Sequence, residues 1–221
     1  MNDDGHVLHR VRQALGRANA PAMKAPPAPP PALDDSVVRL VGADARLPEL
    51  FAKRASELKM LVTAVARADV ARLLVAFLQK YPIRKVALSV SPLLDSLKIR
   101  PALESAGFFV RDWYEISLRE MYEFDCAVTD VDYAVAESGT LVIKPSEQQG
   151  RSMSLVPMYH VAVVEASQIL PDMIDLFAKL ASAPDRSNYI LISGPSKTAD
   201  IEMNVVTGVH GPNVVNAFIL Q

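Results

Sequence analysis

The stretch Val128-Thr-Asp-Val-Asp-Tyr-Ala-Val-Ala-Glu-Ser-Gly-Thr-Leu-Val-Ile143 sets a carboxylate and a glycine between two apolar runs. The runs are rich in β-branched and small residues, so they predict two strand-like segments joined by a tight turn around Glu137. Gly139 permits backbone angles closed to other residues and lets a ligand or another chain segment approach the main chain. Two interpretations of Glu137 stay open: a functional carboxylate at a strand end, or an exposed glutamate in a hairpin turn.

The composition is that of an ordinary globular protein, because half of the 221 residues are hydrophobic and 22% are charged. The length favours one domain with an appendage. A formal net charge of -2 argues against a nucleic-acid partner. The sequence has no stretch of about 18 apolar residues and no signal-peptide core, so a cytoplasmic location without a membrane span is expected.

A single cysteine, Cys126, rules out an internal disulfide framework and a cysteine-ligated zinc or iron–sulfur site. Its place in an apolar run is typical of a buried, inert thiol. Gly-x-Gly-x-x-Gly, Walker and Gly-x-Ser-x-Gly motifs are absent from the sequence, as is a His-x-x-x-His pair. We therefore expect this chain to hold no metal and no cofactor.

Proline content divides the chain. A helix is expected at residues 6–17, and residues 21–32 then contain six prolines, which can neither continue a helix nor join a sheet ladder. The sequence thus predicts a helical appendage at residues 1–20, a proline-rich linker at 21–34 and an α/β domain at 35–221.

Within the α/β domain, strand-like and helix-like segments alternate, which indicates parallel pairing through crossover helices. We expect an open, mostly parallel sheet with helices on both faces. Beyond the opening stretch, strands are expected at 60–65, 85–90, 108–110, 161–164, 189–192 and 214–220, and helices at 47–58, 68–80, 92–105, 117–123 and 169–181.

Gly194–Glu202 follows one of these strands and reads as a turn that opens a helix, with Ser196 or Thr198 as N-cap. Free backbone N–H groups at such a helix start, together with the Lys197 ammonium, would bind a small anion. An ordinary capped helix start is the alternative.

Four sequence blocks resemble the LUD domain of LutC/YkgG-type lactate utilisation proteins and occur in that family's order: Asp132–Ile143, Gly150–His160, Ser193–Glu202 and Gly208–Pro212. Ser138 stands where the family more often has threonine, and a hydroxyl is present either way. The resemblance implies an α/β fold similar to the ribose-5-phosphate isomerase and CoA-transferase-like superfamily. It also implies a role in the oxidation of L-lactate to pyruvate together with iron–sulfur partner proteins.

Because one cysteine cannot hold a cluster, the chain is expected to act as a non-redox subunit of that system. The alternative is a small-molecule binder, or an enzyme of acyl or CoA transfer, that uses a crevice at Glu137 for an anionic or carboxylate ligand. Glu137 is the candidate catalytic residue, expected in one crevice with His160 and the turn Ser196–Asp200. The residues expected to bind ligand are Ser138, Gly139, Thr140, Arg151, His160, Gly194, Ser196, Lys197, Thr198, Asp200, Glu202, His210 and Gly211.

Overall fold

The computed structural model describes residues 9–11, 13–16, 39–42, 44–182, 188–199, 205–207 and 211–221, with the backbone alone at 198, 199 and 205–207. The chain divides into two units, Met1–Val38 and Arg39–Gln221. Helical backbone at residues 9–11 and 13–14 falls within the helix expected at 6–17. The expected linker lies outside the described residues, so the boundaries near residues 20 and 34 stay a prediction.

The second unit is built on a six-stranded sheet in which every neighbouring pair of strands is parallel. From one edge to the other its strands are β1 (Leu61–Val65), β12 (Val214–Leu220), β7 (Tyr159–Glu165), β4 (Cys126–Asp130), β2 (Lys85–Leu88) and β3 (Phe109–Asp112). This sheet confirms the predicted open, mostly parallel α/β fold.

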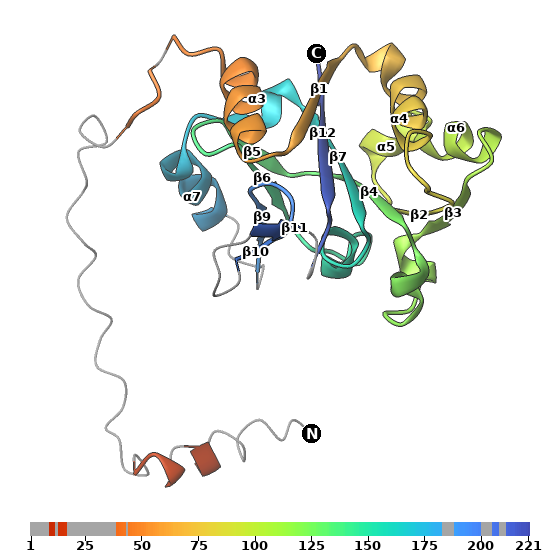
Figure 1. Ribbon diagram of the computed structural model, residues 1–221. Coiled ribbons are helices and arrows are strands. Elements are labelled where there is room, and N and C mark those ends of the chain that lie inside the picture. The colour runs from red at the N-terminus through yellow and green to blue at the C-terminus, as the bar shows by residue number, and fades with distance from the viewer. Residues whose placement is uncertain are drawn as a thin grey trace. The chain divides into compact units, whose positions relative to one another are not determined.

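Three helices cover one face of the large sheet, on the right in Figure 1: α4 (Val70–Leu78), α5 (Pro92–Ser96) and α6 (Ile99–Ser105). Their buried leucines, such as Leu74 and Leu103, pack on strand residues that include Val128 and Phe218. The sequence predicts one helix over 92–105, but the structure has two. The break occurs at Lys98, whose φ of 54° is left-handed and interrupts the helix.

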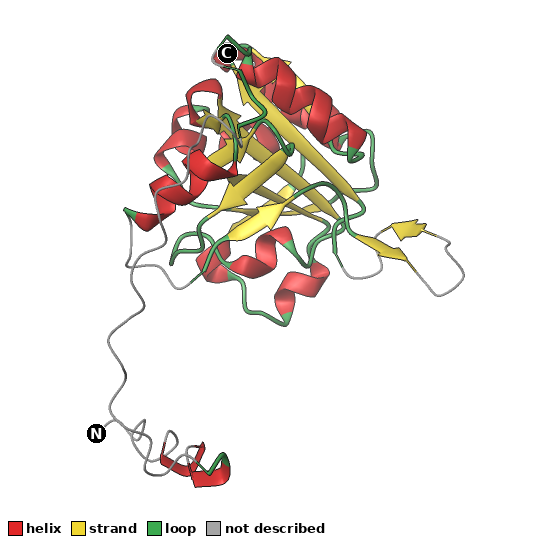
Figure 2. Ribbon diagram, turned by 90° about the vertical axis from the view of Figure 1, so that its left-hand side faces the viewer, coloured by secondary structure: helices red, strands yellow, loops and turns green. Residues whose placement is uncertain are grey.

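The other face carries a second, four-stranded sheet, which the sequence did not predict as a separate layer. Its strands, in spatial order, are β8 (Ile169–Leu170), β5 (Tyr133–Val135), β6 (Thr140–Ile143) and β9 (Ile190–Ile192). Helix α3 (Leu47–Glu57) packs beside it through Phe51 and Ala55. Helix α7 (Met173–Ala181) covers its outer face, where Leu176 meets Val135 and Val142. Figure 2 shows strands lying between helices on both sides.

Residue alternation explains the position of this second sheet. Ala134 and Leu141 face the large sheet, whereas Val135 and Val142 face α7, so both faces of the β5–β6 hairpin are buried. The remaining short 3₁₀ helices are η1 (Arg67–Asp69), η2 (Trp113–Glu115), η3 (Glu120–Glu123), η4 (Arg151–Ser154) and η5 (Ala166–Gln168). Among the described residues, no helix combines the length and hydropathy needed to cross a bilayer.

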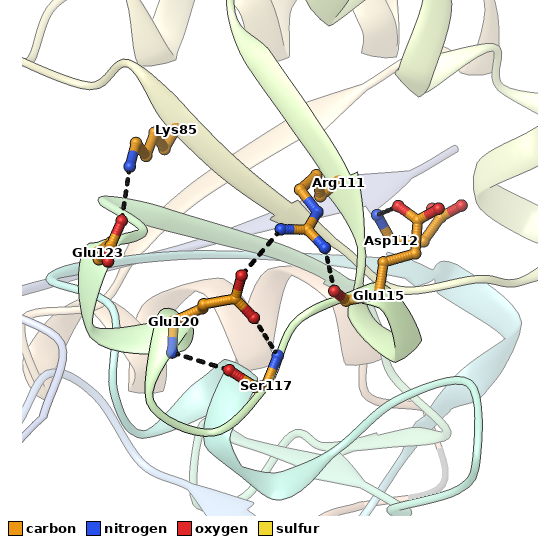
Figure 3. A network of polar contacts seen from close by, with 7 residues as sticks. All are labelled: Lys85, Arg111, Asp112, Glu115, Ser117, Glu120 and Glu123. Carbon is orange, nitrogen blue, oxygen red and sulfur yellow. Dashed lines mark hydrogen bonds and ion pairs between the residues drawn. The ribbon is translucent and has the colours of Figure 1, made fainter.

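A polar network holds the segment that follows the edge strand β3 (Figure 3). A guanidinium nitrogen of Arg111 lies 3.3 Å from the Glu120 carboxylate, which also accepts the backbone N–H of Ser117 at 2.9 Å. Hydrogen bonds from Ser117, followed by Arg111, lower the pKa of Glu120 to about 2. Lys85 and Glu123 form a further ion pair of 2.9 Å. These contacts tie η3 to strands β2 and β3.

Candidate functional site

A crevice of about 520 Å³ opens at the carboxyl ends of β2 and β4. These strands are parallel neighbours in the large sheet. The chain leaves β2 toward α5 on one face of the sheet, and it leaves β4 toward β5 on the other face. This divergence is the topological switch point at which open α/β sheets bind ligands. We refer to this space as the β2–β4 crevice.

Three chain segments form its walls. They are residues 90–95 after β2, residues 130–132 at the end of β4 and residues 144–149 after β6. The third segment is joined to the other two by hydrogen bonds: the Val90 N–H donates to the Gln148 carbonyl at 3.2 Å, and Gln149 Nε2 donates to the Asp130 carbonyl at 3.4 Å. The walls of the crevice are therefore held together by hydrogen bonds to main-chain carbonyls.

Two carboxylates from the β4 segment line the crevice. Asp130 accepts a hydrogen bond from Ser89 Oγ at 3.2 Å. Asp132 accepts the backbone N–H of Lys144 at 2.7 Å. Each carboxylate keeps further acceptor positions, because an ionised carboxylate offers about four.

The environment raises the pKa of Asp132 above its ordinary value. Burial is the main cause and the nearby charge of Asp130 adds to it, whereas the Lys144 N–H bond and the Lys144 charge act in the opposite direction. Paired carboxyl groups in unequal surroundings are a common arrangement for proton transfer. The surroundings of Asp132 thus favour its protonated form, which suits a group that exchanges protons with a ligand.

Lys144 supplies the positive charge of the crevice. Its ammonium makes no hydrogen bond or ion pair with any residue that the structure describes, and the side chain is only partly exposed. An ammonium in this position can donate up to three hydrogen bonds to a ligand carbonyl or carboxylate. Gln149 and Ser91 add neutral polar groups to the walls.

Several predicted site residues meet elsewhere, around the C-terminal end of α3. The Lys197 ammonium donates to the Leu58 carbonyl at 3.0 Å. Gly194 lies so close to that carbonyl that a Cβ would come within 3.0 Å of it. Lys197 thus satisfies a carbonyl left open by the helix end, which is a structural role for a cation.

The predicted Ser138–Thr140 turn packs at the same helix end. Ser138 Oγ donates to Thr140 Oγ1 at 2.8 Å, and Thr140 Oγ1 lies 2.8 Å from Ser193 Oγ. At Gly139, with φ 61°, a Cβ would come within 3.0 Å of the Ala55 backbone. The two glycine-containing motifs are therefore neighbours in the fold, and the segment that approaches Gly139 is helix α3.

Glu137 lies in the turn of the antiparallel β5–β6 hairpin, the second of the two arrangements that the sequence left open. Its backbone N–H donates to the Pro171 carbonyl at 3.0 Å, and its side chain is partly exposed. Glu137 does not line the β2–β4 crevice. A catalytic role for this residue stays a prediction.

His160 is buried near the start of β7, where Nε2 lies 2.9 Å from Thr129 Oγ1. Burial lowers its pKa to about 4, so the ring is neutral at pH 7. His160 does not line the β2–β4 crevice either. Arg151 is exposed at the start of η4, and Gly211 packs against Ser196, whose Cβ would lie 3.1 Å from a Cβ at that glycine.

The helix predicted to follow Gly194 is wrong. Lys197–Ala199 forms β10, which pairs with β11 (Val205–Thr207) in an antiparallel ribbon. The Ser196 N–H donates to the Pro212 carbonyl at 2.9 Å. The anion-binding prediction thus loses the helix terminus on which it was based. Of the other predicted residues, Thr198 is described in its backbone alone, and Asp200, Glu202 and His210 lie outside the described residues.

Sequence reasoning missed the crevice residues Asp130, Asp132 and Lys144. A signal was present, since Asp130 and Asp132, two positions apart, come soon after the apolar run Cys126–Val128. Lys144 likewise follows the last residue of β6. Within the described part of the chain, no three histidine, cysteine, aspartate or glutamate residues are grouped in a way that could hold a metal ion.

The sequence of this chain is similar to those of known proteins. The LUD domain profile matches residues 48–220. The lactate utilization protein C of Halalkalibacterium halodurans is 37% identical over 142 residues, 61% of this chain and 62% of that protein. The protein of the same name from Bacillus subtilis is 39% identical over 113 residues, 48% of this chain and 46% of that protein.

A crystal structure of a DUF162 family protein from Deinococcus radiodurans has the same fold, with a TM-score of 0.61 at 22% identity. That likeness covers 79% of this chain and 96% of the other. The match to the two lactate utilization proteins spans between about half and three fifths of their length. Because the family profile covers most of the chain, the protein belongs to the LUD domain family.

Proposed function

We propose that this chain is a component of L-lactate utilisation that binds a small molecule in the β2–β4 crevice. Relatives named lactate utilization protein C support the pathway. The observation that carries the binding site is the crevice itself, which combines the carboxylates of Asp130 and Asp132 with the Lys144 ammonium at a switch point of the sheet.

The crevice chemistry suits a 2-hydroxy acid or its oxidation product. An ammonium such as that of Lys144 pairs with a carboxylate, and ionised carboxylates accept hydrogen bonds from a hydroxyl. Conversion of a 2-hydroxy acid to a 2-oxo acid releases two protons and two electrons. In this proposal the crevice binds the acid or its product, and both protons and both electrons pass to the redox centre of a partner protein.

The electrons have to be carried by other proteins in this proposal. Cys126 is the sole cysteine; it is fully buried, and burial raises the pKa of its thiol. One inert thiol cannot ligate an iron–sulfur cluster. We therefore propose a non-redox subunit that works with iron–sulfur partner proteins in the cytoplasm.

Growth on L-lactate tests the role of the crevice. In a strain that lacks the native gene, Asp130→Asn and Lys144→Gln should fail to restore growth, because each removes a crevice charge and leaves a polar side chain in its place. Glu147→Gln is the matched control, since Glu147 is exposed on the same loop and does not line the crevice. Melting temperatures should stay close to that of the wild type. Normal growth with both crevice variants would contradict the proposal.

Affinity purification tests the partner. From a native host grown on L-lactate, the tagged chain should recover a protein that contains an iron–sulfur cluster, recognised by its iron and acid-labile sulfide content. A host grown without lactate provides the comparison. Recovery of the chain alone under mild conditions would contradict the proposal that it works in a complex with an iron–sulfur protein.

A further inference from the structure

The walls of the β2–β4 crevice hold more hydrogen-bond acceptors than donors. Asp95, Asp130 and Asp132 contribute three carboxylates, whereas Lys144 is the only cation among the lining residues. Ionised carboxylates only accept hydrogen bonds, so the groups that face them on a ligand must donate. Hydroxyl groups meet that requirement without adding charge.

The charges of the crevice also limit the number of acidic groups that a ligand can carry. One carboxylate or carbonyl can bind Lys144, but a second negative group would meet the aspartates at close range, and like charges repel strongly where solvent is partly excluded. Phosphorylated and polycarboxylate ligands are therefore disfavoured. A polyamine would suit the aspartates but would place a cation against Lys144.

Size gives an independent limit. The crevice volume of about 520 Å³ lies within the range that holds a ligand of many atoms. A three-carbon acid would fill a small part of this volume and leave the rest to water. The walls continue from Asp132 to Asp95 on α5, which gives a longer ligand acceptors along its length.

We propose that the β2–β4 crevice binds a polyhydroxylated compound with one carboxylate or carbonyl group, larger than lactate. The acid or carbonyl end contacts Lys144, and the hydroxyl groups contact Asp130 and Asp132. This inference rests on the proposed function, since it takes the crevice to be the ligand site of the chain.

Thermal-shift and calorimetric titration of the full chain test this ligand class. The probes are D-gluconate, L-lactate, 6-phosphogluconate and spermidine at equal concentrations. D-gluconate should raise the melting temperature of the wild type more than the other three. Asp130→Asn and Lys144→Gln should each weaken its binding at least about tenfold, the effect of losing one charged hydrogen bond, whereas Glu147→Gln should bind it normally.

Each other outcome overturns the inference in a distinct way. Equal binding of L-lactate would remove the size requirement, and stronger binding of 6-phosphogluconate or spermidine would make the charge argument wrong. Binding of D-gluconate that neither variant weakens would place it elsewhere, and no binding of D-gluconate would exclude the ligand class. The growth assay distinguishes failure of this ligand class from failure of the proposed function. If the crevice variants do not grow on L-lactate and D-gluconate does not bind, the ligand class is wrong but the crevice is still the functional site.

Discussion

Gly139→Ala is expected to lower the free energy of unfolding by about 3 kcal/mol or more, which corresponds to a drop of roughly 6–12 °C in melting temperature for a chain of this size. Two costs add. A φ of 61° is unfavourable for any residue with a Cβ, and that Cβ would come within 3.0 Å of backbone atoms of Arg54 and Ala55. Thermal and urea unfolding measure the loss.

A small shift cannot relieve this clash, because the atoms that the new Cβ would meet belong to the backbone of α3. Phe51 and Ala55 on that helix are fully buried between the two sheets. Gly107→Ala is the matched control, since Gly107 has φ 87° but open space around its Cβ position. It should cost only the backbone term of about 1–2 kcal/mol. Equal losses for the two variants would show that the close approach at Gly139 is unimportant.

Local pattern predicted β1, β2, β3, β7 and β12 of the large sheet, because each contains a short apolar run. The segment from Val128 to Ala136 was predicted as one strand-like run, but the structure divides it between β4 of the large sheet and β5 of the second sheet. The prediction for β12 over 214–220 matches the structure residue for residue. The β5–β6 hairpin was predicted as strand, turn and strand, yet its sheet was not. Its other partners, β8 and β9, come from residues 169–192, and no local periodicity reports such a pairing.

Strand pairing that the local sequence does not reveal also explains why the helix predicted after Gly194 is wrong. Serine and threonine beside a glycine and a proline are common at a helix start, so Ser196 and Thr198 looked like N-caps. In the structure, Lys197–Ala199 pairs with Val205–Thr207, and pairing with this neighbouring strand overrides the preference for a helix start.

The crevice could not be found from spacing, because β2 and β4 are neighbours although β3 lies between them in the chain. Asp130 and Lys144 therefore approach one cavity from different loops. The prediction that polar residues after strands would gather at one sheet edge was sound in principle. Glu137 and His160 do not line this crevice, since Glu137 lies in the β5–β6 turn and His160 near the start of its strand, so their role in a site stays a prediction.

Stability should fall by roughly 3 kcal/mol as the pH drops from about 6.5 to 4, owing to His160. The buried ring has a pKa of about 4, below the ordinary value of 6.5. Between these values the unfolded chain binds a proton that the folded chain does not, so acid favours unfolding. Above pH 6.5 the contribution of His160 to the free energy of unfolding is constant, and below pH 4 no further stability is lost through this residue. Urea unfolding at half-unit pH steps measures the slope.

His160→Gln should flatten this slope, because glutamine does not titrate while its amide can still form a hydrogen bond with Thr129 Oγ1. A uniform loss of stability in the variant would not affect the comparison, since the readout is the dependence on pH. Asp132 acts with the opposite sign: its raised pKa means that protonation in acid favours the folded state. Glu120, with its lowered pKa, loses its contribution at lower pH, toward about 2. Both groups are present in wild type and variant, so a slope that is unchanged in His160→Gln would assign the acid sensitivity to a group other than His160.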